Sequence, residues 1–243
     1  MARVICGIQP VREAIRTRGA ELERVVVDAK SSPQLDALAR YARDQGAKVE
    51  TASRQDLDRM THGARHQGAV AMAPELALRA LEELELGPDA LVVALDEIQD
   101  PQNFGAVLRS AVALGASAVV WPEHSSAPLS AATFRASAGA VEHAVLCRVA
   151  GLPSALQSLT SSGLTVIGLD MNGDTPIDEV DLTGPVALVI GAEGKGLRRP
   201  VKTACSRLVR LPMKGPLGSL NASVAAAIAL YEAMRQRRAG VGT

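Results

Sequence analysis

Residues 1–73 alternate between the apolar periodicity of a helix and that of a strand. Pro10 suits the first turn of a helix, and Gly46 suits the position just after a helix end. The pattern predicts helices over 10–18, 33–45 and 54–60 and strands over 24–27, 48–50 and 68–72. These elements form a small α/β unit.

Residues 89–243 contain longer apolar runs that alternate with helical patterns. The run 90–95 has no polar residue, which is typical of a strand buried on both faces of a parallel sheet. Further strands are predicted over 118–120, 144–149, 164–169 and 186–190, and helices over 103–114, 130–138, 153–161, 197–203 and 221–238. This alternation predicts a parallel sheet that binds ligands at the carboxyl ends of its strands.

Composition supports this α/β fold class. Of the 243 residues 47% are hydrophobic but only five are aromatic, so we expect a core of Ala, Val and Leu. Such a core suits helices packed closely on a buried sheet. The length fits two modest domains, which we place at 1–73 and 89–243 with a linker over 74–88.

Charge is informative only through its distribution, because the formal net charge is zero. Seven basic and no acidic residues lie between Lys195 and Lys214, whereas five acidic and no basic residues lie between Asp170 and Asp181. This asymmetry is typical of a polyanion-binding face, although a solvated helix face gives the same pattern.

Cys6, Cys147 and Cys205 are widely spaced and form no CxxC pair, which indicates reduced thiols and neither a disulfide framework nor a zinc site. The N-terminus lacks the pattern of a signal peptide, and no apolar run reaches the ~20 residues that span a bilayer. We expect a cytoplasmic protein without a metal cofactor.

Three segments place Gly, Asn, Ser or Arg next to apolar runs: LDEIQDPQNFGAVLR at 95–109, GAEGKGLR at 191–198 and LPMKGPLGSLNAS at 211–223. Loops of this kind let the backbone approach a ligand closely and offer amide donors and carbonyl acceptors. We expect the three segments to meet at one site.

Each segment also has a simpler interpretation. The glycines at 191–196 fit neither GxGxxG nor GxxxxGK[ST], so a plain turn is as consistent as a phosphate loop. Asn103 can cap its helix, and Arg109 can pair with Asp96 or Glu97 instead of binding phosphate. The N-cap of the last helix is expected to be one of Ser219, Asn221 and Ser223.

His62 and His66 flank a short loop in the first domain. Histidines four apart can ligate a metal on a helix, but Gly63 weakens a helix and no third ligand is evident. A polar loop or an RNA contact is the preferred interpretation.

In combination, the segments resemble the three motifs of the SpoU/TrmH-type (SPOUT class) RNA 2′-O-ribose methyltransferases. The resemblance is carried by DPQNFGAVLRSA at 100–111, LVIGAEGKGLRR at 188–199 and LPMKGPLGSLNASVAAAIALYEAMRQ at 211–236. The first domain, with GIQPVREAI at 7–15 and HGARHQG at 62–68, resembles the ribosomal-protein-like substrate-binding domain of the branch that methylates a guanosine of 23S ribosomal RNA.

The resemblance implies a deep trefoil knot in the parallel-sheet domain, a homodimer formed through that domain, and S-adenosylmethionine as cofactor. The implied cofactor-binding residues are Gly191, Leu211, Met213, Leu220 and Asn221. The implied catalytic residues are Asn103, Arg109, Glu193, Ser219 and Asn221. Since a guanidinium keeps its proton up to pH ~13, we expect Arg109 to bind a phosphate and stabilise the developing alkoxide rather than act as a base.

RNA is the partner that the resemblance implies. Its phosphates are expected along Lys195–Lys214 and the basic tail Arg235–Arg238. The residues predicted to contact RNA are Arg65, His66, Lys195, Arg198 and Arg199. Because aromatics are scarce, base selection is expected to use polar contacts or RNA shape.

Other functions compete with this one. They are a transfer-RNA ribose methylase, a methylase of another ribosomal site, and a non-catalytic RNA-binding protein of ribosome assembly. The intact motif residues argue against the last. A Rossmann dehydrogenase would need GxGxxG after the strand at 90–95, where the chain reads DEIQDPQNFG.

Overall fold

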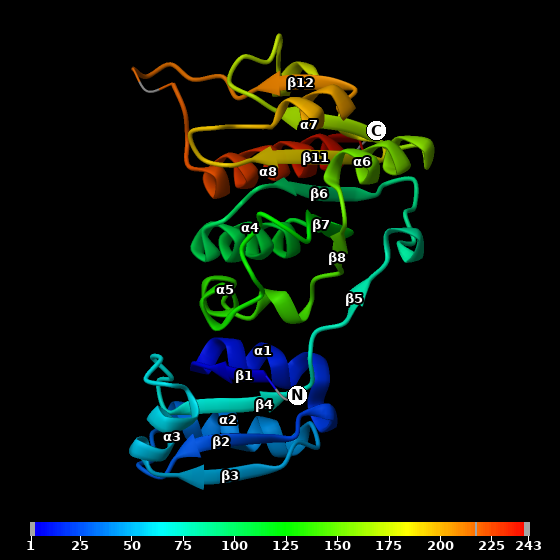
Figure 1. Ribbon diagram of the computed structural model, residues 1–243. Coiled ribbons are helices and arrows are strands. Elements are labelled where there is room, and N and C mark those ends of the chain that lie inside the picture. The colour runs from blue at the N-terminus through cyan, green and yellow to red at the C-terminus, as the bar shows by residue number, and fades with distance from the viewer. Residues whose placement is uncertain (1–2, 217, 241–243) are drawn as a thin grey trace. The chain divides into compact units, whose positions relative to one another are not determined.

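The computed structural model describes residues 3–216 and 218–240. The chain forms two compact units, each with its own sheet and helices (Figure 1). Unit 1 runs to Ala77 and also includes Leu129–His143, whereas unit 2 comprises Leu78–Pro128 and the chain from Ala144 onward. An internal segment therefore folds with the N-terminal unit.

Unit 1 is a four-stranded mixed sheet in the order β1-β4-β2-β3. β2 and β3 are parallel, and the other neighbours are antiparallel. The strands are β1 (Arg3–Cys6), β2 (Arg24–Asp28), β3 (Val49–Ala52) and β4 (Ala69–Ala73). The helices are α1 (Ile8–Arg18), α2 (Pro33–Asp44), α3 (Arg54–Met60) and α5 (Ala131–Ala136), with 3₁₀ turns η1 (Gly19–Glu21) and η3 (Ala140–Glu142).

Helices cover both faces of this sheet because strand side chains alternate between faces. Val25 and Val27 of β2 pack with the buried residues of α1 and α2, whereas Val26 packs with Leu57 of α3. The segment 129–143 is tied to the unit by Glu142, which accepts hydrogen bonds from Arg3 and Arg18.

Unit 2 is an eight-stranded sheet, parallel throughout, in the order β10-β12-β9-β11-β6-β7-β8-β5. Its strands are β5 (Leu78–Arg79), β6 (Leu91–Asp96), β7 (Ala118–Pro122), β8 (Leu146–Val149), β9 (Thr165–Leu169), β10 (Thr175–Pro176), β11 (Val186–Gly191) and β12 (Arg207–Arg210). Its helices are α4 (Pro101–Ala113), α6 (Leu152–Ser161), α7 (Arg199–Ala204) and α8 (Ala222–Gly240), with 3₁₀ turns η2 (Leu81–Glu83) and η4 (Ile177–Glu179).

The predicted α/β class with a parallel sheet is confirmed, and the predicted helices and strands are present within a few residues. Pattern analysis missed β1, β5, β10 and β12, because these strands are short and three of them lie at the edge of a sheet. The knot stays a prediction. None of the helices formed by residues 3–216 and 218–240 has the length and apolarity to cross a membrane.

Candidate active site

The central strand pair of unit 2 brings two of the three motif segments together. In the parallel register of β6 and β11, Asp96 lies opposite Gly191, so the loops that follow both strands start side by side. The fully buried Asp96 carboxylate accepts hydrogen bonds from the Arg198 backbone amide at 2.8 Å and from Arg198 Nε at 2.7 Å. Arg198 also pairs with Glu97 at 3.3 Å. The alternative pairing of Arg109 with these two acids is therefore wrong.

The glycine segment 191–196 folds into a tight loop that requires its glycines. Gly194 and Gly196 have φ of +73° and +63°, and the Gly196 amide donates to the Ala192 carbonyl at 2.9 Å. A Cβ on Gly191 would lie 2.3 Å from the Gly196 carbonyl carbon. The loop thus owes its shape to close backbone contact.

This loop forms one wall of a cavity of about 230 Å³. The predicted cofactor residues Gly191, Leu211, Met213 and Leu220 all line the cavity, and Asn221 does not. Three other predicted residues also line it: Glu193, Lys195 and Ser219. Two of the three motif segments, 191–198 and 211–223, therefore meet in this cavity. The third segment, 95–109, contributes none of its lining.

Sequence analysis missed a third wall, the loop after β9 with Asp170, Met171 and Asn172, and it missed Lys202 of α7. The Asp170 carboxylate pairs with Lys202 Nζ at 2.5 Å and accepts the Asn172 amide at 2.9 Å. Burial favours a higher pKa for Asp170, but these hydrogen bonds outweigh it and lower the pKa. The cavity therefore holds a paired carboxylate and ammonium. The signal that could have found them is the place of Asp170 at the carboxyl end of a strand.

A hydrogen-bonded network joins all three motif segments. Asn221 Nδ2 donates to Asn103 Oδ1 at 3.0 Å and also to Glu193 Oε1. Asn221 Oδ1 accepts from the backbone amides of Ser223 at 2.9 Å and Val224 at 3.3 Å. Asn221 is thus the predicted N-cap of α8, and capping fixes its amide so that Nδ2 faces the other two side chains.

The network stands between this first cavity and a second one. The second cavity, of about 190 Å³, is lined by Glu97, Gln99 and Asn103 together with Ala192, Glu193 and Lys195, the last three of which also line the first cavity. Asn103 is buried in α4, whose N-cap is Asp100. Its predicted capping role is therefore wrong, and its amide is left for this cavity.

Arg109 lies elsewhere on α4. It is exposed, lines neither cavity, and has no ion pair or side-chain hydrogen bond with any other residue of the described ranges. Six residues from Asn103, it points roughly 120° away around the helix at 100° per residue. Within one chain, the structure therefore does not bring Arg109 to the network.

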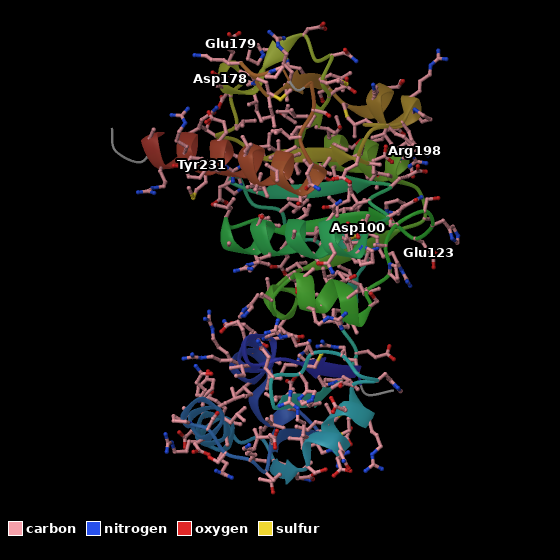
Figure 2. All side chains as sticks on the ribbon, turned by 90° about the vertical axis from the view of Figure 1, so that its left-hand side faces the viewer. Asp100, Glu123, Asp178, Glu179, Arg198 and Tyr231 are labelled. Atoms are coloured by element: carbon pink, nitrogen blue, oxygen red, sulfur yellow. The ribbon has the colours of Figure 1, made fainter. Side chains whose placement is uncertain are left out.

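Ala106 and Ser110, near Arg109 on α4, lie beside an apolar stripe. Val224, Ile228 and Tyr231 of α8 are 46%, 43% and 56% exposed, and with Ala106 and Ser110 of α4 they line a groove of about 450 Å³. Figure 2 shows Tyr231 on α8. Such exposed apolar side chains on one helix face mark an interaction surface.

Comparison with known proteins fits this arrangement. Residues 90–231, more than half of the chain, match the model of the SpoU rRNA Methylase family. The chain belongs to this family. Residues 4–78 match a second model, described as RNA 2′-O ribose methyltransferase substrate binding. The chain is an RNA methyltransferase of the SpoU family.

Relatives cover almost the whole chain. A protein of Mycobacterium sp. (strain KMS) named as an uncharacterized tRNA/rRNA methyltransferase is 41% identical over 97% of this chain and 77% of its own length. The SpoU methyltransferase AviRb of Streptomyces viridochromogenes, solved in complex with the cofactor AdoMet, is 28% identical with a TM-score of 0.81 over 98% of this chain and 92% of its own. A structure described as an RNA 2′-O ribose methyltransferase is 30% identical with a TM-score of 0.82 over 98% and 89%.

In this SpoU chain, the predicted RNA contacts in unit 1 differ in exposure. Arg65 is exposed, but His66 is 3% exposed. His66 Nε2 bonds to Asp58 at 3.0 Å, and Nδ1 accepts the Gly68 amide at 3.0 Å. His66 holds the loop together instead of facing solvent, so the structure does not support the predicted RNA contact of its ring.

The basic run of the SpoU domain is partly neutralised. Arg198 pairs with Asp96, Lys202 pairs with Asp170, and Arg210 donates to two backbone carbonyls. In the tail, Arg237 donates to the carbonyls of Leu182, Asp89, Ala90 and Gly184. Among the described residues, side chains of the run without such a partner are Lys195, Arg199, Arg207 and Lys214. Fewer basic side chains are therefore available to bind RNA phosphates than the charge pattern indicates.

Proposed function

We propose that this SpoU enzyme transfers the methyl group of S-adenosylmethionine to the ribose 2′-hydroxyl of a guanosine in 23S ribosomal RNA. The observation that carries the proposal is the network of Asn103, Asn221 and Glu193 between two adjoining cavities. One cavity suits a methyl donor, and the other suits the acceptor nucleotide.

The first cavity fits S-adenosylmethionine. Leu211, Met213 and Leu220 offer apolar contacts for adenine, and the glycine loop brings backbone groups to the same space. The pair of Asp170 and Lys202 matches the opposite charges of an amino-acid group. When bound, this cofactor supplies an electrophilic methyl group on a sulfonium.

The network orients the acceptor. A ribose hydroxyl is a poor nucleophile at neutral pH, so alignment and help with its proton dominate the rate. Since Asn103 Oδ1 is engaged by Asn221, the Asn103 Nδ2 protons face the second cavity as donors. The Glu193 carboxylate provides an acceptor for the hydroxyl proton, and Ser219 lines the donor side.

Arg109 completes the site from a partner subunit in this proposal. It is too far around α4 to serve the network of its own chain, but its neighbours Ala106 and Ser110 line a groove with the apolar stripe of α8. A homodimer that buries this stripe would bring Arg109 of one protomer to the cavities of the other. The two-pronged guanidinium group of Arg109 would bind the phosphate next to the target ribose and stabilise the developing alkoxide.

RNA binding is divided between the units. Residues 1–73 would serve as the substrate-binding domain, connected by 74–88 to the methyltransferase domain 89–243, and Arg65 would contact RNA from its loop. Lys195 and Arg199 would bind phosphates near the catalytic cavities. Arg198 is assigned a structural role here, since it fixes the glycine loop on Asp96. With ribosomal RNA as substrate, the enzyme would act in the cytoplasm.

Transfer RNA is the alternative substrate, since the name of the mycobacterial relative covers both RNA classes. The experiment that separates them is a map of 2′-O-methyl sites in ribosomal and transfer RNA from cells with and without the gene. We expect one guanosine of 23S RNA to lose its methyl group. Unchanged methylation in both RNA classes would refute the enzyme activity.

Arg109→Lys tests the role of the guanidinium in vitro. Because lysine cannot form a forked contact, we expect methyl transfer to fall roughly 100-fold, within the range for loss of one transition-state donor. Binding of S-adenosylmethionine, measured by calorimetry, should be unchanged. Near-full turnover by the variant would exclude the forked contact.

A further inference from the structure

A groove in unit 1 is separate from the cavities described above. It lies between α1 and α2, which pack against each other. Its volume of about 520 Å³ lies within the roughly 300–1,000 Å³ of small-ligand sites. The lining residues that matter here are Gln9, Arg12, Gln34, Leu38, Tyr41 and Gln67.

The chemistry of this lining suits a nucleotide. It combines three carboxamides, one guanidinium and one phenol ring, and no acidic residue lines it. Carboxamides offer both donors and acceptors to base edges, an aromatic ring stacks on a base, and a guanidinium binds phosphate. The buried Leu38 adds an apolar surface beneath them.

Gln67 is held in place for such a role. It has a φ of +55°, and its Oε1 accepts the Ile8 amide at 3.1 Å. No other side-chain bond of Gln67 occurs among residues 3–216 and 218–240, so its Nε2 protons are left as donors. This contact joins the segments 7–15 and 62–68, which are far apart in the sequence.

Tyr41 is the only aromatic residue in the first 77 positions of the sequence. Its helical spacing with Leu35 and Leu38 predicts a core position, but only those two leucines are buried, and Tyr41 is half-buried in the groove. Phe104 and Trp121 pack on each other at 5.4 Å in the core of unit 2 and are fully covered. Tyr41 is therefore an aromatic that RNA can reach in unit 1.

We propose that this groove binds one unpaired nucleotide of the substrate RNA. The base contacts Tyr41, the carboxamides of Gln34 and Gln67 bind its edge, and Arg12 binds its phosphate. The proposal rests on the proposed function only in taking RNA as the substrate. It adds one stacking contact to the polar contacts and RNA shape that the scarcity of aromatics leads us to expect.

The test measures binding of the full chain to in-vitro-transcribed 23S ribosomal RNA by filter retention. Tyr41→Ala should weaken binding roughly 5- to 100-fold, as expected for loss of one base–aromatic stack. Tyr41→Trp should bind like the wild type. Arg12→Ala should reduce the slope of affinity against salt by about 0.7, the value for one single-strand phosphate contact.

Arg43→Ala is the matched control, because Arg43 is an exposed arginine of α2 that does not line the groove. It should leave affinity unchanged, and thermal unfolding of each variant should match the wild type. Wild-type affinity of both Tyr41→Ala and Arg12→Ala, or no binding of the wild type to the transcript, would overturn the groove assignment. Methyl transfer is assayed separately: its absence from a wild type that shows the groove effects would refute the proposed function alone.

Discussion

At the scale of single residues, Glu142 shows how one carboxylate ties an internal segment to unit 1. Its side chain is 1% exposed and accepts from two Arg3 nitrogens at 2.6 Å each and from Arg18 Nε at 2.8 Å. Burial favours a higher pKa for Glu142, but the two guanidinium groups outweigh it and hold the pKa below 4.5.

We predict that Glu142→Gln destabilises unit 1 by about 3 kcal/mol at pH 7, the cost of removing one partner from a buried ion pair. The depressed pKa means that this stabilisation is present above pH 4.5 and is lost as the pH falls through the folded-state pKa. Urea unfolding at pH 7 and at pH 3 measures both effects.

The difference between variant and wild type should shrink at the lower pH, because the unfolded wild-type chain then takes up a proton at this carboxyl, which reduces the advantage of the ionised folded form. Glu21→Gln is the control: Glu21 is 72% exposed and lies 3.9 Å from the same Arg18. An equal loss in this control would show that the burial of Glu142 is irrelevant.

At the scale of elements, the β11 strand and its glycine loop set the shape of the cavity proposed to bind the cofactor. Gly191 belongs to the strand, pairs with Asp96 of β6, and lies against Gly196 without room for a methyl group. The other end of the loop is fixed by Arg198, the residue before α7, whose backbone amide donates to the Asp96 carboxylate. A strand end and a helix start thus fix the loop from both sides.

Gly191→Ala should open this loop and weaken S-adenosylmethionine binding at least 10-fold. Overpacking of this kind also costs about 1–3 kcal/mol of stability. Isothermal calorimetry with the cofactor and thermal unfolding measure the two effects. Gly215→Ala is the control, since no atom lies within 4 Å of a Cβ at that position. Cofactor affinity equal to that of the wild type would contradict the close-contact account.

The thiols illustrate a further effect of element packing. Cys147 of β8 and Cys205 after α7 are free, as the sequence predicts. Burial raises the pKa of Cys147 to about 11 and that of Cys205 to about 12. Since the thiolate is the reactive form, these cysteines are structural.

At the scale of the whole molecule, Arg109 lies outside the two cavities of its own chain. The stripe of Val224, Ile228 and Tyr231 leaves apolar surface beside Ala106 and Ser110 of α4, which a second copy of the chain would cover. The proposed dimer therefore completes the site and buries the stripe at once.

Ile228→Glu should break this dimer, because a charge at the centre of an apolar interface remains unpaired and desolvated. Light scattering should give twice the 25.3 kDa chain mass for the wild type and the single mass for the variant. In the variant, methyl transfer should fall because the dimer is lost, while cofactor binding persists. Gln157→Glu, an exposed position on α6, should stay dimeric. A monomeric wild type would rule out the partner's role in the site.

The sequence alone determined the alternation of strands and helices, since buried strands and amphipathic helices are local patterns. Through the resemblance of its segments to the SpoU motifs, it also named Gly191, Leu211, Met213 and Leu220 as residues of one binding site, and all four line one cavity. The N-cap of α8 was likewise limited to three residues by local chemistry.

Only the tertiary structure decided which of those residues meet. Contacts between distant segments decide that Arg198 and not Arg109 pairs with Asp96. They also bring Asp170 into the cavity and Gln67 to the Ile8 amide. The same holds for Glu142, whose partners lie in the first 18 residues. Local sequence sets periodicity and caps, whereas strand order and register set which side chains share one space.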